Sequence, residues 1–230
     1  IYESEGFDRE HMRLPAQHDA LIEAVAAVNP RTVVVLANGA PVEMPWVEQV
    51  SAILETYLGG QAAGGGIADV LMGKRNPSGK LAETFAEQLA DIPSQPWFPG
   101  AHRQMQYREG LYIGYRYFDT ARRTVLFPFG HGLSSSRFEI PRATLSNDTL
   151  TAQGSVKLTV EVQNTGAMAG AEVVQVYRHS KNSTVHRPEQ ELCGFAKLYL
   201  EAGATGSVEI QLLADSFQIF DLGAQSWVLE

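Results

Sequence analysis

Residues 156–162 read Val-Lys-Leu-Thr-Val-Glu-Val, a stretch in which apolar and polar side chains alternate without a break. Because successive side chains of a β-strand point to opposite faces, this alternation predicts a strand with one buried and one exposed face. Similar short segments follow it at 173–177, 195–200, 208–212 and 227–229. Turn signals separate these segments, at Asn164-Thr165-Gly166, Gly170, Gly203, Gly206 and Gly223. About seven short strands within 139–230 predict a β-sandwich of the immunoglobulin or fibronectin type.

The first part of the chain, residues 1–95, alternates helix and strand signals instead. Residues 17–28 predict a helix whose apolar face carries Leu21, Ile22, Val25 and Val28. Asn29-Pro30 ends this helix, because proline cannot continue it. The apolar, β-branched run over 32–37 then predicts a strand of a parallel sheet that is buried on both faces.

The same α/β pattern continues to residue 95. Pro45-Trp46 opens a short helix, residues 51–57 predict a second strand, and Gly59-Gly60 predicts a turn into a helix over 61–72. The expected buried stripe of that helix is Ala63, Ile67, Val70 and Leu71. So few parallel strands cannot cover both faces and both edges of a sheet. We therefore expect residues 1–95 to be part of an α/β domain whose remainder comes from another polypeptide.

Residues 96–138 are rich in proline, glycine and aromatic side chains, which is the opposite of a disordered composition. We expect an ordered linker that lies across the surfaces of its neighbours. The chain as a whole has 230 residues, 44% of them hydrophobic, as is ordinary for a soluble protein with a core.

Several functional classes are not supported by the composition. The net charge of −8, without a large basic patch, argues against a nucleic-acid partner. No apolar run approaches the ~20 residues of a transmembrane helix. The start at Ile1-Tyr2-Glu3, without an initiator methionine or a targeting pattern, is expected of a segment from the middle of a longer polypeptide, and it leaves the compartment open.

No metal or cofactor site is predicted. Cys193 is the only cysteine, so it has no disulfide partner in the chain, and its neighbours favour a small buried hydrophobic residue over a reactive thiol. His11 and His18 lack further ligands nearby in the sequence. The glycine-rich stretch over 59–66 lacks the spacing and the Gly-Lys-Ser/Thr end of a phosphate-binding loop.

An ordered set of motifs identifies the family that the chain resembles. Glu3-Ser4-Glu5-Gly6-Phe7-Asp8-Arg9 resembles the segment that carries the acid/base glutamate of family 3 β-glucosidases. Further matches follow in the order of that family: Leu14-Pro15, residues 29–36, 39–46, 68–73, 76–81, 114–119, 127–134 and 187–195. Each motif alone is weak, but together they cover nearly the whole chain.

The resemblance implies three domains: a (β/α)8 barrel, an α/β sandwich and a fibronectin type III-like domain. This chain would then hold the second half of the α/β sandwich (1–95), the linker (96–138) and the third domain (139–230). The family's nucleophile is a barrel aspartate in a Ser-Asp-Trp-type motif, and no Asp-Trp pair occurs here. The implied partners are the N-terminal barrel portion, as a separate chain, and a β-glucoside or cello-oligosaccharide substrate, with a homodimer possible and no cofactor.

The resemblance selects Glu5 as the catalytic acid/base. Retaining glycosidases use two carboxyl groups about 5–5.5 Å apart, one to attack the anomeric carbon and one to protonate the leaving oxygen. Glu3 is the competing carboxylate, but the Glu-Gly dyad of the motif points to Glu5. Gly6 would let the backbone turn and let a sugar approach closely.

Neighbouring residues have less specific expected roles. Phe7 is either a platform for the leaving sugar, since rings offer apolar area to a pyranose face, or a core aromatic. Asp8 and Arg9 are expected to form an ion pair that shapes the loop. Arg108 and Glu109 either pack or touch the rim of the pocket.

Departures from the family pattern leave the substrate open. The family usually has Gly-Gln-Glu where Gly60-Gln61-Ala62 stands, and prolines where Ala82 and Ala86 stand. We therefore keep three hypotheses: a retaining, exo-acting β-glucosidase, a β-xylosidase or exo-glucanase of the same family, and a non-catalytic module that binds carbohydrate or a partner.

Overall fold

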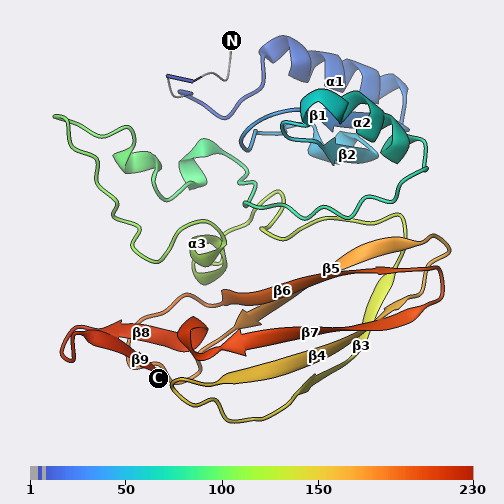
Figure 1. Ribbon diagram of the computed structural model, residues 1–230. Coiled ribbons are helices and arrows are strands. Elements are labelled where there is room, and N and C mark those ends of the chain that lie inside the picture. The colour runs from blue at the N-terminus through green and yellow to red at the C-terminus, as the bar shows by residue number, and fades with distance from the viewer. Residues whose placement is uncertain (1–4, 7–8, 230) are drawn as a thin grey trace. The chain divides into compact units, whose positions relative to one another are not determined.

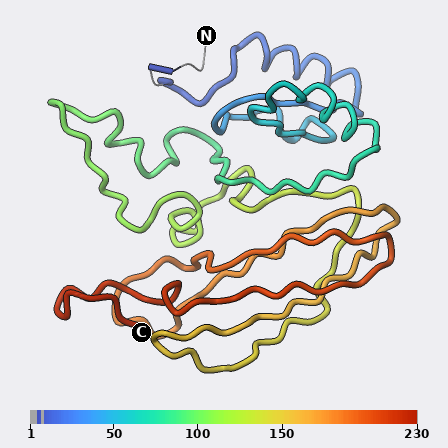
Figure 2. Tube along the Cα trace, viewed as in Figure 1, coloured from blue at the N-terminus to red at the C-terminus, as the bar shows by residue number. Residues whose placement is uncertain are grey.

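The computed structural model describes residues 5–6 and 9–229. The chain divides into two compact units. Unit 1 comprises Ile1–Met72, Ala82–Phe118 and Arg122–Phe129, and unit 2 comprises Gly73–Leu81, Asp119–Ala121 and Gly130–Glu230. Most of the aromatic-rich stretch that we expected to be a linker therefore belongs to unit 1. The path of the chain through both units can be followed in Figure 2.

Unit 1 contains the predicted α/β pattern (Figure 1). Its elements are α1 (Ala16–Val28), β1 (Val33–Leu36), η1 (Val47–Gln49), β2 (Ala52–Glu55), η2 (Gly60–Ala62), α2 (Ala63–Leu71), η3 (Leu89–Asp91), η4 (Gln95–Trp97) and the start of α3 (Tyr115–Thr120). β1 and β2 pair in parallel, with Val33 opposite Ala52 and Leu36 opposite Glu55. The predicted α/β class is confirmed.

One face of β1 is largely exposed. Val34 and Leu36 of β1 are 8% and 5% exposed, whereas Val33 and Val35, which point to the other face, are 45% and 39% exposed. The expectation that this strand is buried on both faces is therefore wrong for the described residues. The reason is that the side chains the structure describes bury only one face of β1.

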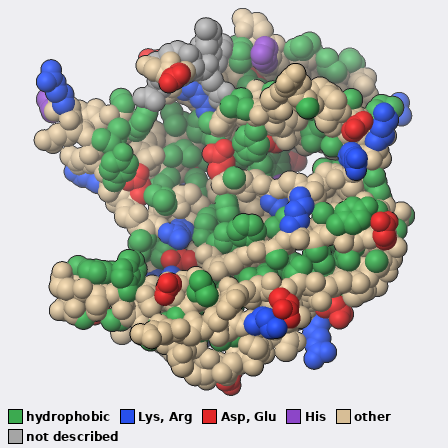
Figure 3. All heavy atoms as spheres, viewed as in Figure 1, with side chains coloured by type: hydrophobic (Ala, Val, Ile, Leu, Met, Phe, Trp, Pro, Cys, Tyr) green, Lys and Arg blue, Asp and Glu red, His purple; other side chains and the backbone are tan. Residues whose placement is uncertain are grey.

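The two helices share this lack of cover. Neither helix has a fully buried residue. Val28 of α1 is 83% exposed, and Leu71 of the predicted α2 stripe is half exposed, so the expectation of a buried stripe is also wrong. Figure 3 shows hydrophobic side chains at the surface over α1. An apolar helix face in water is a face that lacks its packing partner.

Much of the buried core of unit 1 lies outside the helices and strands, in loops. Trp46 is completely buried, and its Nε1 donates a hydrogen bond of 2.8 Å to Oδ1 of Asp19 on α1. Phe85 is also buried, and its backbone pairs antiparallel with that of Phe127, with Phe85 N donating to Phe127 O at 2.8 Å. The first contact joins α1 to the loop after β1, and the second joins the segments around Phe85 and Phe127.

Unit 2 is the predicted β-sandwich. Its elements are β3 (Phe138–Leu145), β4 (Ser155–Asn164), β5 (Gly170–Arg178), β6 (Glu191–Leu200), β7 (Thr205–Leu213), η5 (Ala214–Phe217), β8 (Gln218–Asp221) and β9 (Ser226–Leu229). The strands form an antiparallel sheet in the order β3-β4-β7, an antiparallel pair β5-β6 and a hairpin β8-β9. Seven strands in the described part of this region confirm the predicted number.

The core of unit 2 follows from the alternation that predicted it. Val160 and Val162 of β4 are buried together with Val174, Leu200, Ile210 and Leu212. The sheets approach so closely that a Cβ added at Gly194 of β6 would lie 2.7 Å from Cγ2 of Ile210. Cys193 is partly buried against this core, and its Sγ donates to Val176 O at 3.3 Å.

The long connection from β5 to β6 is closed by a buried carboxylate. Oε2 of Glu191 accepts from Nη2 of Arg178 at 2.8 Å and from Nη2 of Arg187 at 2.9 Å. Glu191 is 8% exposed. Burial lowers the pKa of Arg178, which means that its charge is costly at this position and depends on Glu191.

Candidate active-site segment

Glu5 lies on an exposed turn that it shares with Gly6. Gly6 has a φ of 92°, and a Cβ added there would meet no atom within 4 Å. Glycine is therefore favoured by the backbone conformation and not by lack of space. Phe7 and Asp8, for which a sugar platform and an ion pair with Arg9 were considered, lie outside the described residues.

The segment that follows Glu5 is fastened to the loop after β1. Nη2 of the half-buried Arg9 donates to the carbonyl oxygen of Pro41 at 3.1 Å. Met12 is buried, and its carbonyl accepts from Glu43 N at 2.8 Å. The loop is in turn held by Oε1 of Glu43, which accepts from Leu89 N at 3.2 Å. These contacts hold residues 9–12 against the loop after β1.

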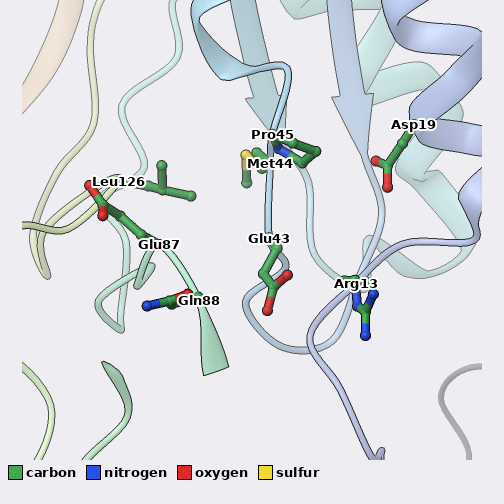
Figure 4. Close-up of a pocket in the computed structure, with 8 residues that line it drawn as sticks. All are labelled: Arg13, Asp19, Glu43, Met44, Pro45, Glu87, Gln88 and Leu126. Atoms are coloured by element: carbon green, nitrogen blue, oxygen red, sulfur yellow. The ribbon is translucent and has the colours of Figure 1, made fainter. Parts of the chain in front are cut away.

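A hollow of about 420 Å³ lies on the Glu43 side of this loop. Figure 4 shows the Glu43 carboxylate pointing into it, with Arg13 on one side and Gln88 on the other. Asp19, which also lines the hollow, is hydrogen-bonded to Trp46. Two of the polar side chains that line this hollow therefore connect segments of unit 1: Glu43 is bonded to Leu89, and Asp19 is bonded to Trp46.

A second cavity, of about 620 Å³, is lined by Arg9 and Pro41. Its walls are mainly apolar, and the Tyr115 and Phe129 rings stack there with centroids 4.8 Å apart. The charged side chains that line it are Arg9, Glu83, Glu109 and Arg116. Oε2 of Glu109 is buried and has no hydrogen-bond partner among the described residues.

The two roles considered for Arg108 and Glu109 separate in the structure. Glu109 lines the 620 Å³ cavity, whereas the Arg108 guanidinium lies 3.9 Å from the centroid of the Trp97 ring. That distance is typical of a cation–π contact. Glu109 thus faces a pocket and Arg108 packs.

Sequence reasoning missed an acidic cluster behind Arg9. Burial raises the pKa of Glu83, the charge of Glu55 raises it further, and Arg9 opposes both effects. Burial, with Glu83 and Glu55 next, raises the pKa of Tyr57 to about 12. Tyr57 has a φ of 45°, and its N–H donates to Oε1 of Glu55 at 2.7 Å. The available signal was the charged Glu83 next to the apolar stretch at 85–86.

The Glu83 environment predicts how stability depends on pH. A carboxyl group whose pKa is raised on folding binds more protons in the folded state, so its contribution to stability is lost as pH rises through the folded pKa. We expect Glu83→Gln to remove part of this loss and to raise the free energy of unfolding at neutral pH. Urea unfolding of the wild-type protein and the variant between about pH 4 and 8 measures this difference. Parallel pH profiles would contradict the expectation.

Other functional chemistry was sought in the described part of the chain. No group of three or more His, Cys, Asp or Glu side chains there could hold a metal ion. His11, considered as a metal ligand, accepts a hydrogen bond on Nδ1 from Arg13 N at 3.2 Å. The helices among these residues are too short or too polar to cross a lipid bilayer.

The fold and the segment define a class of protein: an α/β part that carries a Glu-Gly turn, followed by a fibronectin-type β-sandwich. Residues 2–135 match the Glycosyl hydrolase family 3 C-terminal domain, and residues 172–230 match the Fibronectin type III-like domain. The chain therefore belongs to glycosyl hydrolase family 3.

Similar proteins extend well beyond this chain. Thermostable beta-glucosidase B of Acetivibrio thermocellus is 48% identical over 229 residues, which are 100% of this chain and 30% of that protein. A beta-glucosidase of Rhizobium radiobacter is 44% identical over 97% of this chain and 28% of its own length. The crystal structure of a GH3 beta-glucosidase from Bifidobacterium adolescentis matches with a TM-score of 0.93 and 41% identity, over 99% of this chain and 33% of its own. The chain thus spans about a third or less of each of these relatives.

Proposed function

We propose that this chain is the C-terminal part of a retaining, exo-acting β-glucosidase that hydrolyses terminal, non-reducing β-D-glucosyl residues. The observation that carries the proposal is the exposed Glu5-Gly6 turn, in the family's acid/base motif and anchored through Arg9 to the loop after β1. The relatives that match nearly all of the chain are named beta-glucosidases, which supports the same reaction.

In this proposal Glu5 acts twice. It first donates its proton to the glycosidic oxygen while an aspartate of the barrel portion attacks the anomeric carbon. It then removes a proton from the water that releases the sugar from the enzyme. The turn places Glu5 at the surface of this chain, where a second carboxyl group from outside the chain can approach it.

The barrel portion and the rest of the α/β domain are the proposed partners. The bare face of β1 and the exposed side of α1 support this, because they are apolar surfaces that lack cover. We propose that the cover comes from the part of the relatives that this chain does not span. The intact mass of the active protein distinguishes a companion chain from a single polypeptide.

A panel of aryl glycosides tests the proposed substrate. We expect the complete protein to hydrolyse a β-glucoside at least about tenfold faster, in kcat/KM, than the matching β-xyloside, because the xyloside lacks the hydroxymethyl group that a glucose site contacts. A faster xyloside would favour the β-xylosidase alternative. Faster release of glucose from long glucans than from cellobiose would favour the exo-glucanase.

The non-catalytic alternative makes a different prediction. A module that only binds carbohydrate or a partner would leave the complete protein without hydrolytic activity that depends on Glu5. The exposed aromatic side chains of the β8-β9 hairpin, Phe220 and Trp227, are the feature that such a module could use. Binding without hydrolysis across the panel would favour this alternative.

A further inference from the structure

Arg9 occupies a position from which one side chain can control the placement of Glu5. It follows the Glu5-Gly6 turn closely in the sequence, and its guanidinium donates to Pro41 O at 3.1 Å across a large gap in sequence. A guanidinium is planar, always charged and offers five N–H donors, so it can donate to a carbonyl oxygen and attract a nearby carboxylate at the same time. The backbone at Gly6 lacks a side chain to restrain it, so the restraint has to come from its neighbours.

The loop that accepts the Arg9 hydrogen bond has two further hydrogen bonds, one on each side of Pro41. Nδ2 of the buried Asn38 donates to Ala40 O at 2.9 Å, and the Glu43 carboxylate accepts from Leu89 N. Pro41 lies between these two fixed points. The Arg9 contact therefore ties the residue that closes the Glu5 motif to a loop of unit 1 that is itself hydrogen-bonded on both sides of Pro41.

Charge on the cavity wall acts on the same guanidinium. Arg9 and Glu83 both line the 620 Å³ cavity, and Arg9 is close enough to lower the pKa of the Glu83 carboxyl. The other ionisable groups around Glu83 are Glu55 and Tyr57, and Glu109 and Arg116 line the same cavity. The negative charges of Glu55 and Glu83 repel each other, and the positive charge of Arg9 offsets part of this repulsion.

We infer that Arg9, which is hydrogen-bonded to the Pro41 carbonyl and lines the same cavity as Glu83, positions Glu5 for proton transfer to the leaving group. This inference rests on the proposed function and extends it to the residues that make the acid effective. Proton transfer requires the acid within hydrogen-bond reach of the oxygen, and a misplacement of about 1 Å can cost about 10²-fold in rate.

The test uses the complete family 3 protein and two β-glucosides that differ only in their leaving group. Phenyl β-glucoside needs a proton on the departing oxygen, whereas 2,4-dinitrophenyl β-glucoside does not. The readout is kcat/KM, which reports the first chemical step. We expect Arg9→Met to lower it by about 10- to 100-fold on the phenyl glucoside and by less than about threefold on the dinitrophenyl glucoside. Arg9→Lys is expected to regain part of the loss.

Glu83→Gln separates positioning from folding. We expect this variant to show the same dependence on the leaving group, to a smaller extent, while the protein unfolds at the same or a higher urea concentration. A purely structural contact would reduce stability and both activities together. Should Arg9→Met fail to fold, Arg9→Lys and Glu83→Gln decide the matter. Arg31→Met, which changes an exposed arginine of unit 1 that lines neither cavity, is the matched control and should leave kcat/KM for both glucosides unchanged.

Equal losses on both substrates, or no loss, in Arg9→Met would overturn the inference. Failure of the proposed function is distinguishable from this result. If Glu5→Gln also lacks any dependence on the leaving group, then Glu5 is not the acid and the proposed function fails. If Glu5→Gln shows the dependence and the Arg9 variants do not, only the role of Arg9 is lost.

Discussion

Replacing Glu5 by Ala in the complete family 3 protein is expected to lower kcat/KM about 10²- to 10⁴-fold for a glucoside with a poor leaving group. This is the usual rate contribution of a general acid or base. An activated aryl glucoside should lose far less in this first step, because its leaving group departs without a proton. Azide should restore part of the turnover, since it attacks the glycosyl-enzyme without needing a base.

Two further variants make this result specific. Glu3→Ala removes the competing carboxylate of the same motif and should leave the leaving-group dependence unchanged. Glu10→Gln removes an exposed charge just beyond the motif and should change little. A large loss in Glu3→Ala with normal rates in Glu5→Ala would reassign the acid to Glu3, and normal rates in both would refute the proposal.

Replacing Glu191 by Ala is expected to destabilise the β-sandwich by about 3–5 kcal/mol. Removal of one partner from a buried ion pair leaves the other charge buried without compensation. Here a single oxygen, Oε2, accepts from both Arg178 and Arg187, so the substitution would leave two guanidinium groups without their carboxylate. Hydrogen exchange of the β5 and β6 amides measures the effect in this part of the protein.

The chain offers a matched control for this substitution. Glu209 pairs with Lys157 at the same distance, 2.8 Å, but both side chains are more than half exposed. Glu209→Ala should cost less than about 1 kcal/mol, because exposed ion pairs are screened by water. Similar costs for the two variants would mean that burial does not set the strength of the Glu191 contacts.

The sequence predicted the elements better than their surroundings. Residues 156–162 indicated β4 and which of its side chains are buried, because alternation depends only on the geometry of a strand. The run at 32–37 indicated β1 equally well, but its predicted burial on both faces was wrong. An apolar strand sequence indicates that both faces need packing partners. It does not indicate whether those partners belong to the same chain.

The candidate site divides in the same way. Glu5 was selected through the family motif, since no other feature of the sequence distinguishes it from other glutamates. Glu83 was not found, because its environment depends on Glu55 and Arg9, which are remote from it in sequence. The Arg9 contact with Pro41 was not predicted for the same reason, because the two residues are remote from each other in sequence.

The exposed valines of β1 have a consequence for the folding of this protein in the cell. Among the described residues β1 and β2 form a sheet of two strands, so each strand has an edge with no neighbouring strand, and such edges recruit other strands. Left uncovered, this apolar face would be a target for chaperones and a site for aggregation. The cover proposed above would prevent this best if it were already folded when Val33 to Leu36 emerge from the ribosome.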